Sequence, residues 1–301
     1  MSNKKEKITN EHVLASFIDG DQLPFQNETA DILYYLMPHQ SCLGGSNDIL
    51  PQNAIKKIAN ADCVCTRRHT ILPSLDSVFA DSVKRKRALI WIDPTSIPTE
   101  CLTNIIRLWL EKVRPTDNVG LGMLIPQCET NYSQTKNVKA WIPSSSGSLI
   151  KDANSLKIPV WYPSLRRNKD SLQRISDMFT PIEIFPIVDF PRIIDYEAEK
   201  EITTHRLMLD RYRTRTRNFI YLNTGCPEEG FEMLSKSFEA VTRNGIMPRS
   251  LLLTPGGSSI SYLVTLMSGV IAGATFITPD LEVPFYKSNK QLGFTLIKKC
   301  E

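Results

Sequence analysis

The sequence predicts an α/β fold of the Rossmann-like kind, with a largely parallel sheet covered by helices on both faces. Short, continuous apolar runs recur along the chain, and such runs are typical of strands that are buried on both sides. Segments with apolar residues at helical spacing separate many of these runs, so strand and helix alternate. Of the 301 residues, 42% are hydrophobic and 23% are charged, which is ordinary for a globular chain with a large core.

The elements are expected in a definite order along the chain. Residues 1–11 form a polar tail, and residues 12–301 form the α/β domain, with a boundary between two lobes near 144–150 or within 195–217. The first elements are an amphipathic helix over 28–37 and a Gly-Gly loop, a helix and a buried strand over 38–66. Strands are then expected over 88–93, 119–126, 138–143, 157–163, 182–190, 218–223, 250–254 and 274–278. Helices are expected over 98–113, 228–245 and 195–217, the last being long, charged and placed to join the two halves.

Residues 250–279 carry no charged side chain, which raises the question of a membrane span. Pro255, Gly256 and Gly257 interrupt this stretch, and no basic cluster flanks it closely, so we expect no span. The better interpretation is a βαβ unit in which the loop 255–261 opens a buried helix. The loop follows a strand and precedes a helix, where free N–H groups bind anions. The alternative is that Pro-Gly-Gly only turns the chain.

Two glycine-rich segments carry a resemblance to a known family. The segments "PGGSSISYLVTLMSGVIAGATFITPD" and "GGSNDILPQNAIKKIANADCVCTRRHTI" resemble motifs of sialyltransferases and related flagellin-modification-type Rossmann glycosyltransferases. The resemblance implies that the chain uses a nucleotide-activated sugar donor. We expect no cofactor. The resemblance also implies that both loops line one nucleotide pocket. The pocket residues would be Gly44, Gly45, Ser46, Asn47, Gly256, Gly257, Ser258 and Ser259.

The candidates for chemistry lie at the ends of expected strands. Arg67 and Arg68 could bind a diphosphate, because guanidinium groups pair with phosphate oxygens bidentately. His69, Asp93 and Asp280 are the candidates for acid–base work. Each also has a plainer interpretation, since strands end in polar residues and Asp-Pro commonly starts a turn.

Several classes of function are disfavoured by what the sequence holds. The seven Cys residues are odd in number and scattered, which is typical of reduced thiols in a cytoplasmic protein. Cys63 and Cys65 have no second pair of ligands, so we predict no metal site. Because the formal net charge is only +4, it does not call for a nucleic-acid partner.

Two hypotheses for the function remain. The first is a nucleotide-sugar-dependent glycosyltransferase-like protein, as the resemblance implies. The second is a noncatalytic α/β adaptor or scaffold subunit of a larger bacterial or viral assembly. It is favoured because the family pattern has a His after the second loop, whereas this chain has none after His205. The arginines of the segment Arg206–Arg217 would then contact an acidic protein partner.

Overall fold

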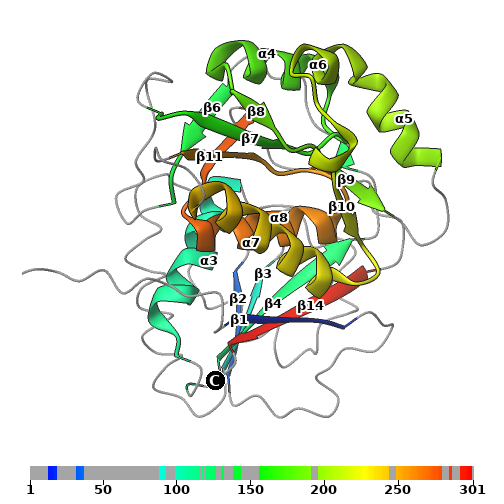
Figure 1. The fold of residues 1–301 in the computed structure, drawn as a ribbon. Coiled ribbons are helices and arrows are strands. Elements are labelled where there is room, and N and C mark those ends of the chain that lie inside the picture. Colours follow the sequence, from blue (N-terminus) through cyan, green and yellow to red (C-terminus); the bar gives the residue numbers. More distant parts are fainter. Residues whose placement is uncertain are drawn as a thin grey trace, which may run out of the picture. The chain divides into compact units, whose positions relative to one another are not determined.

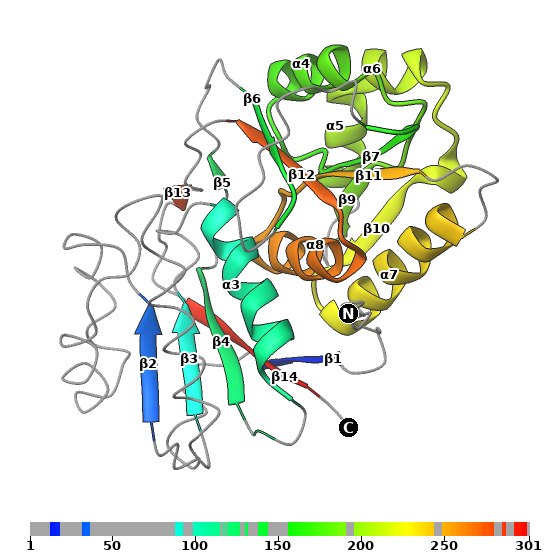
Figure 2. The same cartoon turned by 90° about the vertical axis from the view of Figure 1, so that its left-hand side faces the viewer.

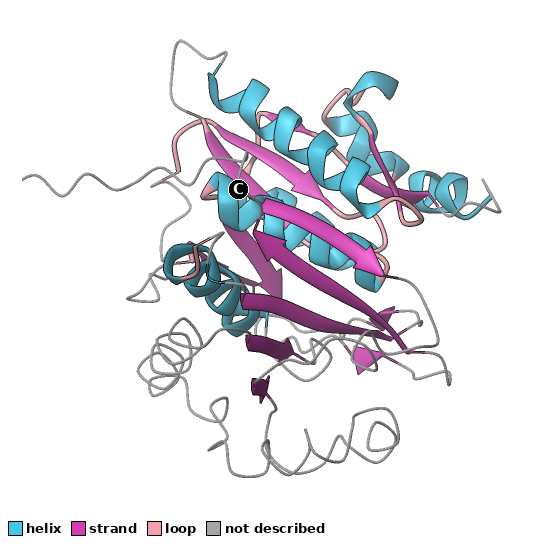
Figure 3. Cartoon of the chain, turned by 90° about the horizontal axis from the view of Figure 1, so that it is seen from below, coloured by secondary structure: helices cyan, strands magenta, loops and turns pink. Residues whose placement is uncertain are grey.

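The structure is a computed structural model that describes part of the chain in detail, as helices and strands joined by loops (Figure 3). The described residues are 13–18, 32–36, 88–92, 99–114, 117, 119–126, 130–131, 138–143, 156–190, 196–243, 249–279, 285–286 and 292–299. The chain divides into two compact units: the first comprises 1–93, 105–124 and 294–301, and the second comprises 94–104 and 125–293.

The first unit is built on a mixed sheet of five strands in the order β1-β14-β4-β3-β2. Their bounds are Val13–Ile18 for β1, Ile32–Leu36 for β2, Ala88–Ile92 for β3, Val119–Pro126 for β4 and Leu292–Lys299 for β14. β2, β3 and β4 are parallel to one another (Figure 2), whereas β1 is antiparallel to β14. Helix α3 (Thr99–Lys112) lies within the expected helix 98–113.

The prediction of a helix over 28–37 is wrong, because Ile32–Leu36 form strand β2. These five residues are Ile-Leu-Tyr-Tyr-Leu, which suit a strand by composition. β2 pairs with β3 residue by residue, from Ile32 opposite Ala88 to Leu36 opposite Ile92. Pairing with a distant part of the chain therefore overrode a local helical pattern.

The second unit contains a mostly parallel sheet. Five strands follow the order β6-β12-β11-β7-β8, and β9 and β10 pair with each other in parallel. The bounds are Val138–Trp141 for β6, Pro159–Pro163 for β7, Glu183–Ile184 for β8, Ile187–Phe190 for β9, Ile220–Asn223 for β10, Ser250–Thr254 for β11 and Thr275–Pro279 for β12. A parallel bridge between Ser164 and Ile187 connects β9 to the end of β7. β6 alone is antiparallel to its neighbour, β12. A separate antiparallel pair joins β5 (Thr130–Asn131) to β13 (Phe285–Tyr286).

When the short strand β8 is left aside and the β9–β10 pair is joined to β7 through the bridge at Ser164, the parallel strands lie in the order β10, β9, β7, β11, β12. If β7 is counted as the first strand along the chain, this is the order 3-2-1-4-5 of a Rossmann-like fold. Right-handed crossovers through helices are the usual way to connect such strands. The predicted fold class, an α/β fold with a largely parallel sheet, is therefore confirmed.

Helices cover both faces of the sheet, as Figure 1 shows. They are α4 (Lys169–Phe179), α5 (Tyr196–Thr204), α6 (Arg206–Arg211), α7 (Pro227–Arg243) and α8 (Ser259–Ala272). On one face Trp161 and Leu252 belong to a core that includes residues of α4, α5 and α6. On the other face Tyr162 packs edge-to-face on Phe238 of α7, with ring centroids 4.7 Å apart. Alternate residues of one strand point to opposite faces, which explains why these strands are apolar throughout.

The uncharged stretch 250–279 forms the βαβ unit that its pattern predicted, namely β11, α8 and β12. Helix α8 is buried along nearly its whole described length, beside α7 and against the strands β11 and β12 at Gly269, and a helix covered in this way needs no polar face. Among the described residues, none of the helices has the length and apolar character that crossing a membrane requires.

The long helix expected over 195–217 is not formed. The segment contains α5, α6 and a single 3₁₀ turn, η5 (Thr216–Asn218), and the break between α5 and α6 falls at His205. The His205 side chain is buried at this break, where its Nε2 lies 2.7 Å from Leu165 O. Residues 196–218 lie within the second unit, while 144–150 lie outside the described residues.

Candidate functional site

The second unit has a topological switch point at the carboxyl ends of β7 and β11. These strands are neighbours, but the chain continues from them to strands that lie on opposite sides of the pair. From β7 it continues through α4 to β9, and from β11 it continues through α8 to β12. Ser164 N–H, just after β7, donates to Thr254 O at the end of β11 over 3.0 Å. In open α/β sheets, ligands bind at such a point.

The Pro-Gly-Gly loop after β11 packs against the chain's own side chains. Its residues 255–257 are buried. A Cβ atom on Gly256 would lie 2.9 Å from Ser164 Oγ. Gly257 has a φ of +92°, and a Cβ atom there would lie 2.6 Å from Asp189 Oδ1. Glycine is therefore required at 257 both for the backbone conformation and for the close approach of Asp189.

The N-terminus of α8 already holds a carboxyl group. Ser258 is the N-cap, and its hydroxyl accepts a hydrogen bond from Ser261 N–H over 3.2 Å. The backbone N–H of Ser258 donates to Asp189 Oδ2, which comes from the end of β9. The Asp189 carboxyl group thus takes the place at the helix N-terminus where a bound phosphate would lie in a nucleotide-binding fold.

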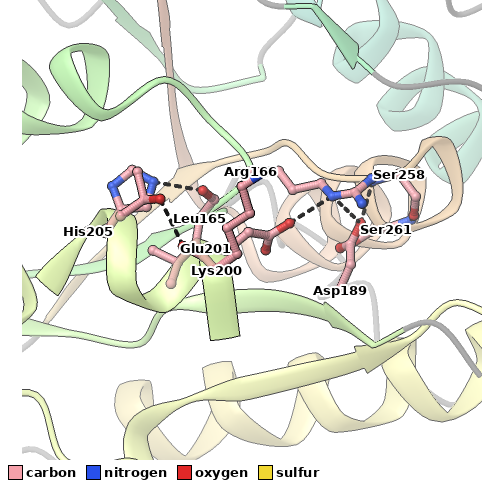
Figure 4. A network of polar contacts seen from close by, with 9 residues as sticks. Leu165, Arg166, Asp189, Lys200, Glu201, His205, Ser258 and Ser261 are labelled. Atoms are coloured by element: carbon pink, nitrogen blue, oxygen red, sulfur yellow. Dashed lines mark hydrogen bonds and ion pairs between the residues drawn. The ribbon is translucent and has the colours of Figure 1, made fainter. Parts of the chain in front are cut away.

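Two arginines that follow β7 complete this polar network, and Figure 4 shows the first of them, Arg166, with its partners. Arg166 Nε lies 2.8 Å from Glu201 Oε1 of α5 and 3.9 Å from Asp189 Oδ2, so its guanidinium lies between two carboxyl groups. Arg167 is buried, and its Nε donates to Pro255 O over 2.6 Å. Arg166 and Arg167 therefore tie the loop after β7 to α5 and to the loop after β11.

Burial shifts the pKa of two members of the network in opposite ways. Burial raises the pKa of Asp189, although hydrogen bonds from Ser261 and Ser258 and the charge of Arg166 act against the shift. Burial also lowers the pKa of His205, which favours the neutral imidazole. His205 Nε2–H donates to Leu165 O over 2.7 Å, because a carbonyl oxygen can only accept. Burial therefore acts against the charged form of both groups.

The structure describes only one of the two glycine-rich loops expected from the sequence. Gly256, Gly257 and Ser258 lie at the switch point, and Ser259 is the first residue of α8. The other predicted site residues lie outside the described residues: Gly44, Gly45, Ser46, Asn47, Arg67, Arg68, His69, Asp93 and Asp280. In the part of the chain that the structure describes, no three His, Cys, Asp or Glu side chains gather as metal ligands.

The sequence analysis missed the residues that surround the loop. Asp189 lies in the apolar run of β9, and its burial there was a signal that a polar partner must be close. Arg166 and Arg167 follow an expected strand just as Arg67 and Arg68 do, so the same reasoning applies to both pairs. The sequence around Glu201 and His205 does not indicate a buried site, because its many charged residues are typical of a solvent-exposed helix.

The arginines of the segment Arg206–Arg217 are exposed on the surface. Arg206 lies 3.7 Å from Asp210, and Arg211 pairs with Asp177 of α4. The pairing with Arg211 lowers the pKa of Asp177. Among the described residues, Arg213, Arg215 and Arg217 have no carboxylate partner. Several guanidinium groups of the segment are thus exposed to solvent.

These features define the second unit as a Rossmann-like α/β domain whose switch point holds a buried polar network. The sequence matches no protein-family model and no curated protein. One solved structure that is similar is a functionally unknown protein from Pseudomonas aeruginosa PAO1. Its identity to this chain is 8%, the match covers 81% of this chain and 91% of that chain, and the TM-score is 0.24.

Proposed function

We propose that this chain is a noncatalytic α/β adaptor or scaffold subunit, in which the switch point of the second unit supports the fold. The observation that carries the proposal is the carboxyl group of Asp189 at the N-terminus of α8, bound to Ser258 N–H and in close approach to Gly257. A phosphate needs that N–H group and that space. Because the chain's own side chain fills both, the loop is built for internal packing.

The surface supports the same proposal. The exposed arginines of the segment Arg206–Arg217 are suited to an acidic protein partner, since paired guanidinium and carboxylate groups make strong bidentate hydrogen bonds. The mild net charge of +4 and the modest, local basic segment do not favour a nucleic-acid partner. The seven scattered Cys residues support a cytoplasmic location.

A second candidate is the nucleotide-sugar-dependent glycosyltransferase-like function that the resemblance implies. It is favoured by the strand order 3-2-1-4-5 and by Arg166, whose side chain is 22% exposed beside the switch point. Ligands of such folds bind at this position, and a guanidinium there could contact a diphosphate. In this candidate Asp189 would have to leave Ser258 N–H when the donor binds.

Thermal unfolding of the full chain with nucleotides tests the two candidates. The probes are cytidine and uridine mono- and diphosphates and their sugar conjugates at millimolar concentration. A ligand present at 100 times its Kd stabilises the folded state by about 2.7 kcal/mol, which gives a clear rise in Tm. The adaptor proposal expects no rise with any of these probes.

A rise in Tm would contradict the adaptor proposal, and two variants would show where the nucleotide binds. Loss of the rise in Arg166→Ala, with the rise kept in Lys169→Ala, would place the nucleotide at the switch point. Lys169 is the matched control because it is exposed and lies only three residues further along the chain.

A further inference from the structure

In the second unit, charged and apolar side chains gather far from the switch point, at the edge of the sheet where its parallel strands begin. The strands are parallel, so their amino ends lie together at the edge opposite the candidate site. Ser250 N–H donates to Lys157 O over 2.8 Å, and Ile182 N–H donates to Pro159 O over 3.0 Å. These bonds bring the residues that precede β7, β8 and β11 to one place.

The arginine segment is attached to the same edge. Arg211 pairs with Asp177 near the end of α4, and Tyr212 Oη lies 2.7 Å from Ser176 Oγ. Asn218 Nδ2 donates to Ile184 O over 3.5 Å, at the other end of the segment. In Figure 1, α4 and α6 accordingly lie side by side. The segment therefore crosses this edge of the sheet, from α4 to the start of β10.

The edge carries more positive than negative charge. Its cationic side chains are exposed or half-buried, and they are Lys157, Arg211, Arg213, Arg215, Arg217 and Arg249. The described carboxylates beside them are Asp177, which pairs with Arg211, Glu183, which lies 3.5 Å from Arg249, and Asp210, which lies 3.7 Å from Arg206. Most of the positive charge thus remains for a partner, so a partner with negative charge is favoured here.

Two large apolar side chains lie on the same edge. Met178 is 53% exposed and follows Asp177, and Ile182 is 57% exposed and precedes Glu183. A protein segment can bury its own apolar side chains on such residues, and methionine adapts to partners of different shape. Single-stranded nucleic acids instead stack their bases on aromatic rings, which these two residues do not supply. The pair of apolar side chains therefore favours a protein partner.

We infer that this basic and apolar edge, formed by residues 157, 177–183, 211–217 and 249, docks an acidic segment of another protein. The segment carries large apolar side chains among its Asp and Glu residues: the acids pair with the arginines, and the apolar residues cover Met178 and Ile182. The inference rests on the proposed adaptor function, and it adds the place and the chemistry of the partner. A segment docked at this edge would not contact the switch point, which lies at the carboxyl ends of the strands.

Selection from a displayed library of random 16-residue peptides, with the full chain as bait, tests the inference. Selected peptides should be enriched in Asp and Glu interspersed with Leu, Ile, Phe or Trp. Their binding should weaken at least tenfold in the charge-reversal variant Arg213→Glu/Arg215→Glu/Arg217→Glu, measured by fluorescence anisotropy. The matched control is Lys169→Glu/Lys200→Glu/Lys236→Glu, which makes the same change in net charge at exposed positions away from this edge.

A second pair of measurements separates the apolar contribution and the nucleic-acid alternative. Met178→Ser/Ile182→Ser should weaken the same peptides at least tenfold without changing Tm, because both side chains are exposed. Selected peptides that are not enriched in acidic residues would overturn the inference, and so would peptides that bind the arginine variant and the lysine control with equal affinity. So would a 20-nucleotide single-stranded RNA that binds the edge more tightly than any selected peptide. A nucleotide-induced rise in Tm would overturn the proposed function instead, so the two failures are distinguishable.

Discussion

At the scale of single residues, the switch point depends on a close approach between a glycine and a buried carboxyl group. Asp189 lies in β9, and Gly257 lies in the loop after β11, which is not a neighbour of β9 in the sheet. The N–H group of Ser258, the residue after Gly257, donates a hydrogen bond to Asp189. Arg166 and Glu201 surround this pair with further charges. A buried polar group without a hydrogen-bond partner lowers the free energy of unfolding. Replacing one residue of the network would therefore leave its neighbour without a partner and destabilise the fold.

Gly257→Ala should lower the free energy of unfolding by about 3 kcal/mol, because the methyl group meets Asp189 while the backbone stays in the left-handed region. Gly273→Ala is the matched control. Its φ is +67°, but a Cβ atom there has open space, so the cost should be about 1 kcal/mol. Urea unfolding measures both. Equal losses in the two variants would argue against the contact with Asp189.

The raised pKa of Asp189 predicts a definite dependence of stability on pH. Because the folded pKa lies above the ordinary value of 3.8, the folded state binds more protons than the unfolded state between the two values. This contribution to stability is full below pH 3.8 and is lost as the pH rises through the folded pKa. Asp189→Asn, which keeps an oxygen acceptor for Ser258 N–H, should remove that loss. Urea unfolding at a series of pH values measures the free energy of unfolding of the original protein and of Asp189→Asn. The same dependence on pH in both proteins would contradict the prediction.

At the scale of elements, the apolar helix α8 is explained by where it packs. It packs beside α7, against Leu253 of β11 and Phe276 of β12, and Tyr262 meets Thr99 of α3, so side chains on several sides of it are buried. Gly269 lets it approach the sheet, because a Cβ atom there would overlap the Leu253 side chain and lie 2.7 Å from Phe276 Cζ. A glycine in a helix costs about 1 kcal/mol relative to alanine, and close packing offsets that cost here.

Gly269→Ala should therefore destabilise the second unit by about 1–3 kcal/mol, in spite of the better helix propensity of alanine. Gly230→Ala in α7 is the control, since the nearest atom to its added Cβ would be Leu222 Cδ2 at 3.3 Å. That variant should be neutral or slightly more stable. The Tm values of the original protein, Gly269→Ala and Gly230→Ala, measured by thermal unfolding, test this prediction. A more stable Gly269→Ala protein would show that α8 does not pack closely at this point.

At the scale of the whole molecule, the second unit is assembled from two stretches of the chain. Thr99 Oγ1 lies 2.7 Å from Tyr262 Oη of α8, and Trp141 Nε1 donates to Thr103 Oγ1 over 3.1 Å. Both Tyr262 and Trp141 are buried, so these contacts lie inside the unit. The start of α3 is therefore part of the core of the second unit, although it is separated from it in the sequence.

A fragment of residues 125–293 should consequently be less stable than a fragment of residues 94–293. The shorter fragment lacks Thr99 and Thr103, so two buried polar groups lose their partners, at a cost of about 1–3 kcal/mol each. Urea unfolding followed by tryptophan fluorescence compares the two. Identical midpoints would contradict the role assigned to the start of α3.

Much of the fold could be predicted from the sequence, because the strands of the second unit are short apolar runs with clear ends. "SLLLT" and "ATFIT" were predicted as strands and form β11 and β12. The strand β2 and the break at His205 could not be predicted. Each depends on a partner far along the chain, which a local pattern does not contain. The candidate site was found only in part: the glycine loop had a local signal, whereas Asp189, Arg166 and Glu201 became visible as a group only in three dimensions.

The sequence by itself determined that this chain alternates strands and helices, and that the uncharged stretch 250–279 is a buried βαβ unit. Both follow from periodicity and from turn residues, which act locally. Only the tertiary structure decided what the Pro-Gly-Gly loop does. Its glycines admit Ser164 and Asp189, and its N–H group at Ser258 is bound by a carboxyl group that lies 69 residues earlier in the chain. Which side chain fills such a space depends on packing between distant strands, and local sequence does not encode that arrangement.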